Sequence, residues 1–374
     1  MKPLAGRALF DFSAPAYFTE AAPFLKTCRN AGWHCNVVFE WSGRGSEEMK
    51  AQCRAVGCAL TELPDYLVYH IEDVSQPQAT AAADTPSARE PLRRRQRIYQ
   101  WLQRFCPPLA RTAELAWSIP RLIRLRRWGE DFVRAAKPDV VLFGPFNSYG
   151  RAANAIFAAA KKAGIPTVCM PSLPLMGEPY QILERFESQR RGIIGQRVRA
   201  NYDLFNRVCA LLLPSWTRTD GRDGLRLFHR DPAEIIAGRL VGLNFTDGWQ
   251  KPSPHFDRVF LPTPHSVHCL EIAGYPMDCT VMTGMPRMDV VVKSLTDGQA
   301  REEFYHSIRL PVGAPYIVMN VEPAAEHYVA SWDDHWYNFK KTLGTVIRAK
   351  LPVVLSLHPL CAPANYAFAE REFG

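Results

Sequence analysis

The chain has 374 residues, 47% of them hydrophobic and 22% charged, an ordinary balance for a globular protein of about two domains. No apolar run approaches the roughly 20 residues that a membrane-spanning helix needs, and the first residues lack the apolar stretch of a secretory leader. The ten cysteines include no Cys-x-x-Cys pair, which argues against structural zinc and favours buried, reduced thiols. We therefore expect a cytoplasmic protein.

The formal net charge of +8 is concentrated in one segment. Between Arg89 and Arg134 there are twelve arginines, no lysine and four acidic residues, so this segment accounts for the whole excess. Apolar residues recur among the arginines at helical spacing, and a loop without apolar period, Gln76 to Pro91, precedes them. Three interpretations stay open: helices that meet an anionic membrane or a polyanionic acceptor, helices that bind nucleic acid, and a solvated helix pair. No nucleic-acid-binding motif accompanies the arginines, so we expect no nucleic acid.

Elsewhere, short apolar runs alternate with helical patterns, several of which stop at glycine. The expected strands are Arg7–Phe12, Cys35–Phe39, Cys58–Leu63, Pro138–Gly144, Ile165–Met170, Val208–Leu213, a run from Val259, Cys279–Met282, Tyr316–Asn320 and Pro352–Leu357. The expected helices are Tyr17–Ala31, Glu47–Val56, Leu115–Ala136, Tyr149–Ala163, Ser266–Ala273 and His335–Lys350. This alternation predicts an α/β protein built from βαβ units around parallel sheets.

Two domains are expected. The first is 1–292, with an arginine-rich helical insertion at about 76–136. The second is 293–374, which follows a hinge near Lys293 to Gln299 and has room for one βαβ unit and part of a helix. A Rossmann-type half needs three or more parallel strands to cover its core. We therefore expect either a portion of a longer protein, which we favour, or a reduced second domain.

Two segments near the end of the chain follow expected strands: Thr283-Gly-Met-Pro-Arg-Met-Asp289 and Leu355-Ser-Leu-His358-Pro359. Ligands of open α/β sheets bind outside the carboxyl ends of the strands. Gly284 allows close backbone approach, Arg287 supplies positive charge, and His358 can donate or accept a proton near neutral pH. These residue types suit an anionic ligand, although an ion pair within the first segment and an ordinary loop histidine remain alternatives.

Polar residues also follow expected strands of the first domain. Asp11 and Ser13 come after the first strand, where Asp11 is a candidate base or, alternatively, a cap for the next helix. Asn147 and Ser148 precede an expected helix. They are candidates either for binding an anion or for plain N-capping. His265 and His268 lie on either side of another helix start, as structural or acceptor-side residues; a metal site would need a third ligand at suitable spacing, and the sequence offers none.

The layout and motifs resemble GT-B-type transferases, which have two Rossmann-like domains. Thr283–Asp289 followed by Leu357–Pro359 is similar to the Gly-x-Pro-Arg-Asn-Asp turn and His-Pro of the teichoic-acid and capsular-polysaccharide polymerases, the CDP-glycerol glycerophosphotransferase-like enzymes. Val259–Pro264 through Glu271–Gly274 also resembles the non-hydrolysing UDP-GlcNAc 2-epimerases. The order of expected strands and helices agrees with these families over Pro138–Pro359. The motifs themselves agree over only some twenty residues.

The sequence departs from both families. Polymerases of this kind carry His-Gly, with the His as base, where this chain reads Met170-Pro-Ser-Leu-Pro-Leu-Met-Gly-Glu178. Glu178 is our substitute candidate for that base. The Asp-Tyr-Ser-Ser-type element of the polymerases and the His-Arg-Arg-Glu-Asn of the epimerases are both missing.

The resemblance implies a transferase that moves a sugar or glycerol-phosphate unit from a nucleotide-sugar or CDP-glycerol-type donor to a glycan or lipid-linked acceptor. It implies no bound metal or cofactor, and a peripheral position on the inner face of the plasma membrane through Arg93–Arg134. The alternatives are a sugar-nucleotide 2-epimerase and a non-catalytic acceptor-binding or scaffold portion of a longer protein. The implied site residues are Asp11, Glu178 and His358 for catalysis; Gly284, Arg287, Asp289, His358 and Pro359 for the donor; and Ser13, Asn147, Ser148 and His265 on the acceptor side.

Overall fold

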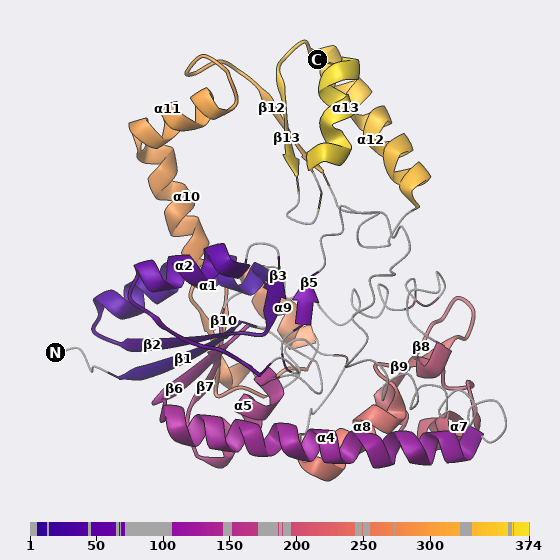
Figure 1. The fold of residues 1–374 in the computed structure, drawn as a ribbon. Coiled ribbons are helices and arrows are strands. Elements are labelled where there is room, and N and C mark those ends of the chain that lie inside the picture. Colours follow the sequence, from indigo (N-terminus) through magenta and orange to yellow (C-terminus); the bar gives the residue numbers. More distant parts are fainter. Residues whose placement is uncertain are drawn as a thin grey trace, which may run out of the picture. The chain divides into compact units, whose positions relative to one another are not determined.

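Seven parallel strands form the main sheet of the protein, in the order β11-β10-β7-β6-β1-β2-β4 (Figure 1). The strands are β1 (Arg7–Phe12), β2 (His34–Phe39), β4 (Ala59–Thr61), β6 (Val140–Phe143), β7 (Thr167–Cys169), β10 (Arg258–Leu261) and β11 (Thr280–Met282). This sheet, flanked by helices, confirms the α/β class and the Rossmann-like architecture expected for the first domain.

The computed structural model describes the chain except for 1–5, 13–14, 44–45, 65–66, 68, 72–106, 145–151, 171–185, 187–188, 190–195, 244–248, 250–254, 273, 322–330, 358–360, 362 and 374. The described residues form two compact units, one up to Met288 and the other from Asp289 onward. Each unit is treated by itself below. The expected domain limits, 1–292 and 293–374, stay a prediction.

The order of the strands reverses between β1 and β6. From β1 the chain builds β2 and β4 toward one edge, then returns to place β6 on the other side of β1 and continues with β7, β10 and β11. Asp11 of β1 lies opposite Val38 of β2 and Phe143 of β6, so the three strands end together. A reversal of this kind is where open α/β sheets form their ligand crevice.

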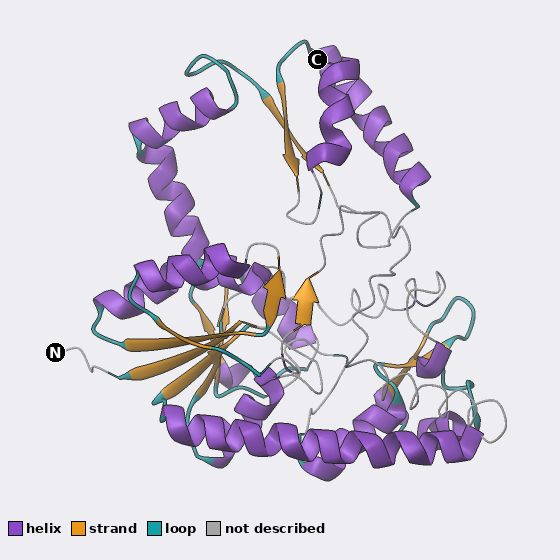
Figure 2. Ribbon diagram, in the orientation of Figure 1, coloured by secondary structure: helices purple, strands orange, loops and turns teal. Residues whose placement is uncertain are grey.

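Both faces of the central strands are buried. Along β1, Leu9 packs in one hydrophobic cluster, whereas Phe10 and Phe12 pack in the cluster on the opposite face. Helices α1 (Pro15–Asn30) and α2 (Ser46–Ala55) cover the phenylalanine face, and α5 (Ala152–Lys162) and α9 (Pro264–Ile272) cover the leucine face (Figure 2). Such two-sided burial explains why these strands are continuous apolar runs.

A 30-residue helix, α4 (Pro107–Ala136), lies outside α5 and also packs on α8 (Pro232–Val241) (Figure 1). Its Leu122 and Leu125 are buried against Ala155 of α5 and Val241 of α8. Where α4 crosses α5 there is no room for a side chain, because a Cβ on Gly129 would lie 2.6 Å from the backbone of Ala155.

At its N-terminal end, α4 is fastened by a buried arginine. Arg111, only 3% exposed, donates to Asp203 at 2.9 Å, to Asp231 at 2.6 Å and to Asn206 at 3.0 Å. Asp203 caps α7 (Leu204–Leu212) and Asp231 caps α8, so one guanidinium joins three helices. Burial alone would lower the pKa of Arg111, but the two carboxylates outweigh burial and raise it above its usual value.

The expected strand Val208–Leu213 is wrong: this stretch belongs to α7, followed by a 3₁₀ turn and the antiparallel pair β8 (Thr217–Thr219) and β9 (Arg226–Phe228). An apolar run of this length suits a buried strand or a helix equally well. Asp203 caps this helix through its Oδ1, which accepts from the Asn206 amide at 2.7 Å, while its Oδ2 accepts from the distant Arg111.

The expected hinge at Lys293–Gln299 falls largely within helices. Helix α10 (Pro286–Thr296) and helix α11 (Gly298–Ser307) meet at Asp297, whose carboxylate accepts from the Gln299 amide at 3.0 Å and caps α11. A carboxylate at this position satisfies backbone N–H groups that have no partner inside the helix. The break between helices is therefore one residue long.

In the second unit, β12 (Ile317–Val321) pairs in parallel with β13 (Val353–Leu357). Helices α12 (Trp332–Val346) and α13 (Pro363–Phe373) supply the rest of the core, where His335 and Tyr366 share a buried 2.9 Å hydrogen bond. A further parallel pair, β3 (Trp41–Gly43) and β5 (Tyr69–Ile71), belongs to the first unit. None of the helices in the described ranges has the length and apolar composition that crossing a bilayer requires.

Gly129→Ala tests the crossing of α4 and α5. The added methyl group meets the Ala155 backbone, which cannot rotate away, so we expect unfolding free energy to fall by about 1–3 kcal/mol. Gly344→Ala is the matched control, because nothing lies within 4 Å of a Cβ at that position in α12. There alanine's helix propensity should stabilise by up to about 1 kcal/mol. Urea denaturation of both variants measures the difference, and a neutral Gly129→Ala would contradict the close approach.

Arg111→Ala tests the joint between the three helices. Without the guanidinium, two largely buried carboxylates lose their shared cation, and we expect a loss of about 3–5 kcal/mol in unfolding free energy. The control is Arg134→Ala, which removes an exposed pair with Asp131 that is worth at most about 1 kcal/mol. Similar losses for the two variants in urea denaturation would refute the special role of Arg111.

Candidate functional site

Two buried acidic residues mark the carboxyl edge of the sheet beside the strand reversal. Asp11, near the end of β1, is 1% exposed, and Glu40, directly after β2, is 0% exposed. Side chains alternate along each strand, and Leu9 and Val38 both face the α5 side, so Asp11 and Glu40 face it too. The sheet therefore presents two carboxylates toward the beginning of α5.

The backbone holds Glu40 at this position. Its amide donates to the carbonyl of Phe12 at 3.1 Å, which extends the pairing of β1 and β2 by one residue. Its Oε1 accepts a hydrogen bond from the amide of Ala153, in the first turn of α5. A carboxylate at a helix N-terminus satisfies a backbone donor and opposes the positive end of the helix dipole.

This contact changes what the site can bind. A free helix N-terminus attracts phosphate, but here the first turn of α5 already interacts with the Glu40 carboxylate, and Asp11 adds a second acid on the same face. The N-terminus of α5 is therefore occupied by a carboxylate of the protein itself.

The predicted donor-side residues of the first unit lie at the far edge of the sheet. Gly284 has φ +75°, a conformation that favours glycine, in the turn after β11. The turn is anchored by the Thr283 amide, which donates to the Leu261 carbonyl at 3.0 Å. Arg287 follows, exposed in the first turn of α10, and Asp289, also exposed, begins the second unit. The predicted turn is thus a glycine bend that leads directly into a helix.

His265 also lies at the carboxyl edge, in the first turn of α9 after β10, and it is exposed. Its Nε2 lies 3.4 Å from the Sγ of Cys269 one helical turn later. Three strand spacings separate β10 from β1, which corresponds to about 14 Å between their ends. The structure therefore does not bring His265 together with Asp11.

The remaining candidates lie outside the described residues: Ser13, Asn147, Ser148, Glu178, His358 and Pro359. The same holds for 93–106 of the arginine-rich segment. In the part of α4 that is described, Leu122 and Leu125 pack inward, whereas Arg121, Arg124 and Arg127 are exposed, as are Trp117 and Ile123. Within the described ranges no group of three or more His, Cys, Asp and Glu side chains could hold a metal ion.

Sequence reasoning overlooked Glu40. A signal was available, because an acidic residue directly follows the apolar run Cys35–Phe39, at the end of a predicted strand where ligand-binding residues gather. Its partner, Ala153, gave no signal at all, since the amide that it donates is common to every residue type but proline. Asn154, the next residue of α5, is likewise buried, at 3% exposure.

No family model matches the chain, and a search of curated proteins finds no match either. Solved structures resemble it distantly. UDP-GlcNAc 2-epimerase from Neisseria meningitidis bound to UDP-GlcNAc aligns with a TM-score of 0.40 at 12% identity, over 95% of this chain and 73% of that one. A putative UDP-N-acetylglucosamine 2-epimerase from Listeria monocytogenes aligns with a TM-score of 0.45 at 9% identity, over 98% and 66%. CalG4, the calicheamicin glycosyltransferase, aligns with a TM-score of 0.40 at 11% identity, over 97% and 68%.

Substitutions of Glu40 separate its charge from its hydrogen bond. Glu40→Ala removes both and leaves a buried amide without this acceptor, so we expect a loss of about 1–3 kcal/mol in unfolding free energy. Glu40→Gln keeps a side-chain oxygen and loses only the interaction with the helix dipole, about 0.3–2 kcal/mol. Urea denaturation measures both. Glu47→Ala, at an exposed position in the first turn of α2, is the control: it loses an exposed pair with Lys50, and its stability should change far less than that of Glu40→Ala. Identical losses for the two Glu40 variants would contradict a role for the acceptor oxygen.

Proposed function

We propose that the protein is a GT-B-type transferase that moves a sugar or glycerol-phosphate unit from a nucleotide-activated donor to a hydroxyl of an acceptor. The observation that supports this most is the pair of buried carboxylates, Asp11 and Glu40, at the strand reversal of a Rossmann-like sheet. Ligands of such sheets bind at this position. Carboxylates in this setting select a ligand with hydroxyl groups, which is what a transferase acceptor offers.

In this proposal Asp11 is the general base. As the acceptor oxygen attacks the activated carbon or phosphorus of the donor, Asp11 takes the hydroxyl proton. The bond from the transferred unit to the nucleotide phosphate breaks, and the nucleotide leaves with the bonding electrons. Positioned bases of this kind contribute roughly 100- to 10,000-fold to rate. Glu40 is a positioning residue, because it holds the start of α5 against the end of β2.

The donor phosphates need positive charge, which the carboxylate edge does not provide. Arg287 after the glycine bend at Gly284 is the candidate for that role, together with Asp289, His358 and Pro359 from the motif resemblance. The finer assignments are also part of the proposal: a nucleotide-sugar or CDP-glycerol-type donor, a glycan or lipid-linked acceptor, surface-polysaccharide synthesis, and a position at the inner face of the plasma membrane.

The epimerase alternative stands beside this proposal, because buried carboxylates at the strand reversal of a Rossmann-like sheet suit either enzyme. Its sequence resemblance covers Val259–Pro264 through Glu271–Gly274. Within that stretch Thr263 acts locally, because its Oγ1 accepts from the Ser266 amide at 3.2 Å at the start of α9. A helix cap accounts for this threonine without any catalytic role. The remaining alternative, a non-catalytic acceptor-binding or scaffold portion, is an outcome of the test below.

A thermal-shift series with UDP, CDP, CMP and GDP and their sugar or glycerol conjugates tests the donor. We expect one nucleotide series to raise the melting temperature, since a ligand at about 100 times its Kd adds roughly 2.7 kcal/mol to the stability of the folded state. No shift with any nucleotide, from a folded sample, would favour the scaffold alternative.

Asp11→Asn then tests the base. With the effective donor and an acceptor glycan, turnover should fall about 100-fold or more while the nucleotide-induced shift persists. Asp131→Asn, at an exposed position of α4, should leave both unchanged. Unaltered turnover in Asp11→Asn would remove Asp11 from the mechanism, and product released without any acceptor would favour the epimerase.

A further inference from the structure

Helix α7 carries leucines on its outer face. Leu204 is 70% exposed, Leu211 77%, Leu212 74% and Val208 44%. At about 100° per residue these four positions fall within one arc of roughly 100°, with Arg207 at its border. A surface helix of an ordinary globular protein has polar residues in this position.

The leucine face of α7 cannot turn inward, because the opposite face of the helix is already packed and hydrogen-bonded. Asn206 is 0% exposed and donates to the carbonyls of Arg197 and Arg199, both at 2.7 Å. Cys209 and Ala210 pack with Phe228 of β9. With Asp203 capping its start and held by Arg111, α7 cannot rotate to bury its leucines.

The surroundings of this face are basic. The segment 196–231 carries seven arginines, no lysine and four aspartates, a net charge of +3. Two of those aspartates, Asp203 and Asp231, are already paired with Arg111. Among the arginines of this segment, Arg207 is exposed at the border of the leucine arc and Arg226 lines the adjoining pocket.

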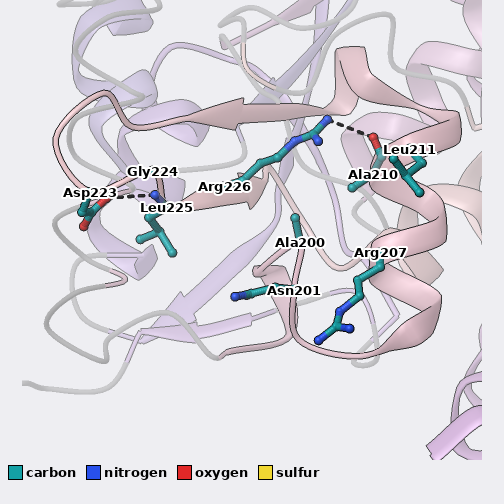
Figure 3. Close-up of a pocket in the computed structure, with 9 residues that line it drawn as sticks. All are labelled: Ala200, Asn201, Arg207, Ala210, Leu211, Asp223, Gly224, Leu225 and Arg226. Atoms are coloured by element: carbon teal, nitrogen blue, oxygen red, sulfur yellow. Dashed lines mark hydrogen bonds between the residues drawn. The ribbon is translucent and has the colours of Figure 1, made fainter.

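A pocket of about 510 Å³ opens next to the leucine face, between α7 and the β8–β9 turn (Figure 3). Leu211 and Arg207 line it from α7, and Arg226 and Asn201 line it from outside the helix. Arg226 donates to the Ala210 carbonyl at 2.9 Å, which holds its guanidinium along one wall. One acid, Asp223, also lines the pocket, and its Oδ1 accepts from the Leu225 amide at 2.9 Å.

We propose that α7 is a membrane-docking helix. Lying in the plane of an anionic lipid surface, it buries Leu204, Val208, Leu211 and Leu212 among the acyl chains, and the adjoining pocket takes a lipid phosphate against Arg207. Nine residues span only about 14 Å, so the helix lies in the interface and does not cross the bilayer. Basic residues that border an apolar helical face are the features that bind helices to anionic membranes.

Charge complementarity favours an anionic membrane over a second copy of the chain or nucleic acid as the partner of this face. A second copy packed face to face would bring two arginine-bordered surfaces together, since a two-fold interface repeats the same patch on both subunits. Nucleic acid would accept the arginines but would leave the leucines in water. On α4, by contrast, Leu122 and Leu125 are buried against α5 and α8, so that side of the helix is not available to lipid.

Vesicle co-sedimentation tests the proposal with the full chain and without any donor, so its result is independent of the proposed reaction. We expect binding to vesicles of equal parts phosphatidylcholine and phosphatidylglycerol, and much weaker binding to phosphatidylcholine alone. The double variant Leu211→Gln/Leu212→Gln should bind the mixed vesicles about tenfold or more weakly. Arg207→Gln should lose part of the binding and part of its salt sensitivity.

Ile272→Gln is the matched control, since Ile272 is a 65% exposed apolar residue on α9, and it should bind like the original chain. Unchanged melting temperatures would show that the variants fold. Equal binding to both vesicle types, or full binding by the double leucine variant, would overturn the proposal. So would a dimer in sedimentation velocity without lipid that the leucine substitutions dissociate, because the face would then be covered by a second copy.

Discussion

The hydrogen bond from the Ala153 amide to the Glu40 carboxylate governs the geometry of the first unit. It joins the end of the second strand to the first turn of the helix that follows β6, across the point where the strand order reverses. Because neither group is exposed to water, the contact cannot be exchanged for a solvent contact without leaving a buried polar group unsatisfied. Together with the packing of Ala152, Ile156 and Ala160 in the core, this contact sets the position of α5 and the shape of the sheet edge near Asp11.

The outer helical layer depends on α5 in turn. Gly129 lets α4 approach the α5 backbone closely, and Arg111, about five turns earlier on α4, joins the capping residues of α7 and α8. A long helix pinned at one position by close packing and at another by a buried cation has little freedom to shift. The orientation of α7, including its exposed leucines, is therefore a consequence of contacts made at its buried side.

Acidic and basic side chains lie in different parts of the first unit. Acidic side chains lie buried at the strand reversal, whereas several arginines of α4 and Arg207 of α7 are exposed. In the two proposals above, groups that donate hydrogen bonds meet the sheet edge and an anionic surface meets α7. An acceptor that is itself attached to a lipid would satisfy both ends, which joins the proposed reaction to the proposed docking surface.

The sequence by itself determined the class and most of the elements. Strands such as Val140–Phe143 and helices that stop at glycines are specified by local periodicity and local backbone freedom, which a reader of the chain can see. The tertiary structure decided what Val208–Leu213 becomes, because that apolar run fits a strand or a helix until Asp203 and Arg111, 92 residues apart, meet. It also decided the site: Glu40 and Ala153 are 113 residues apart, and no local pattern couples a carboxylate to a backbone amide at that distance.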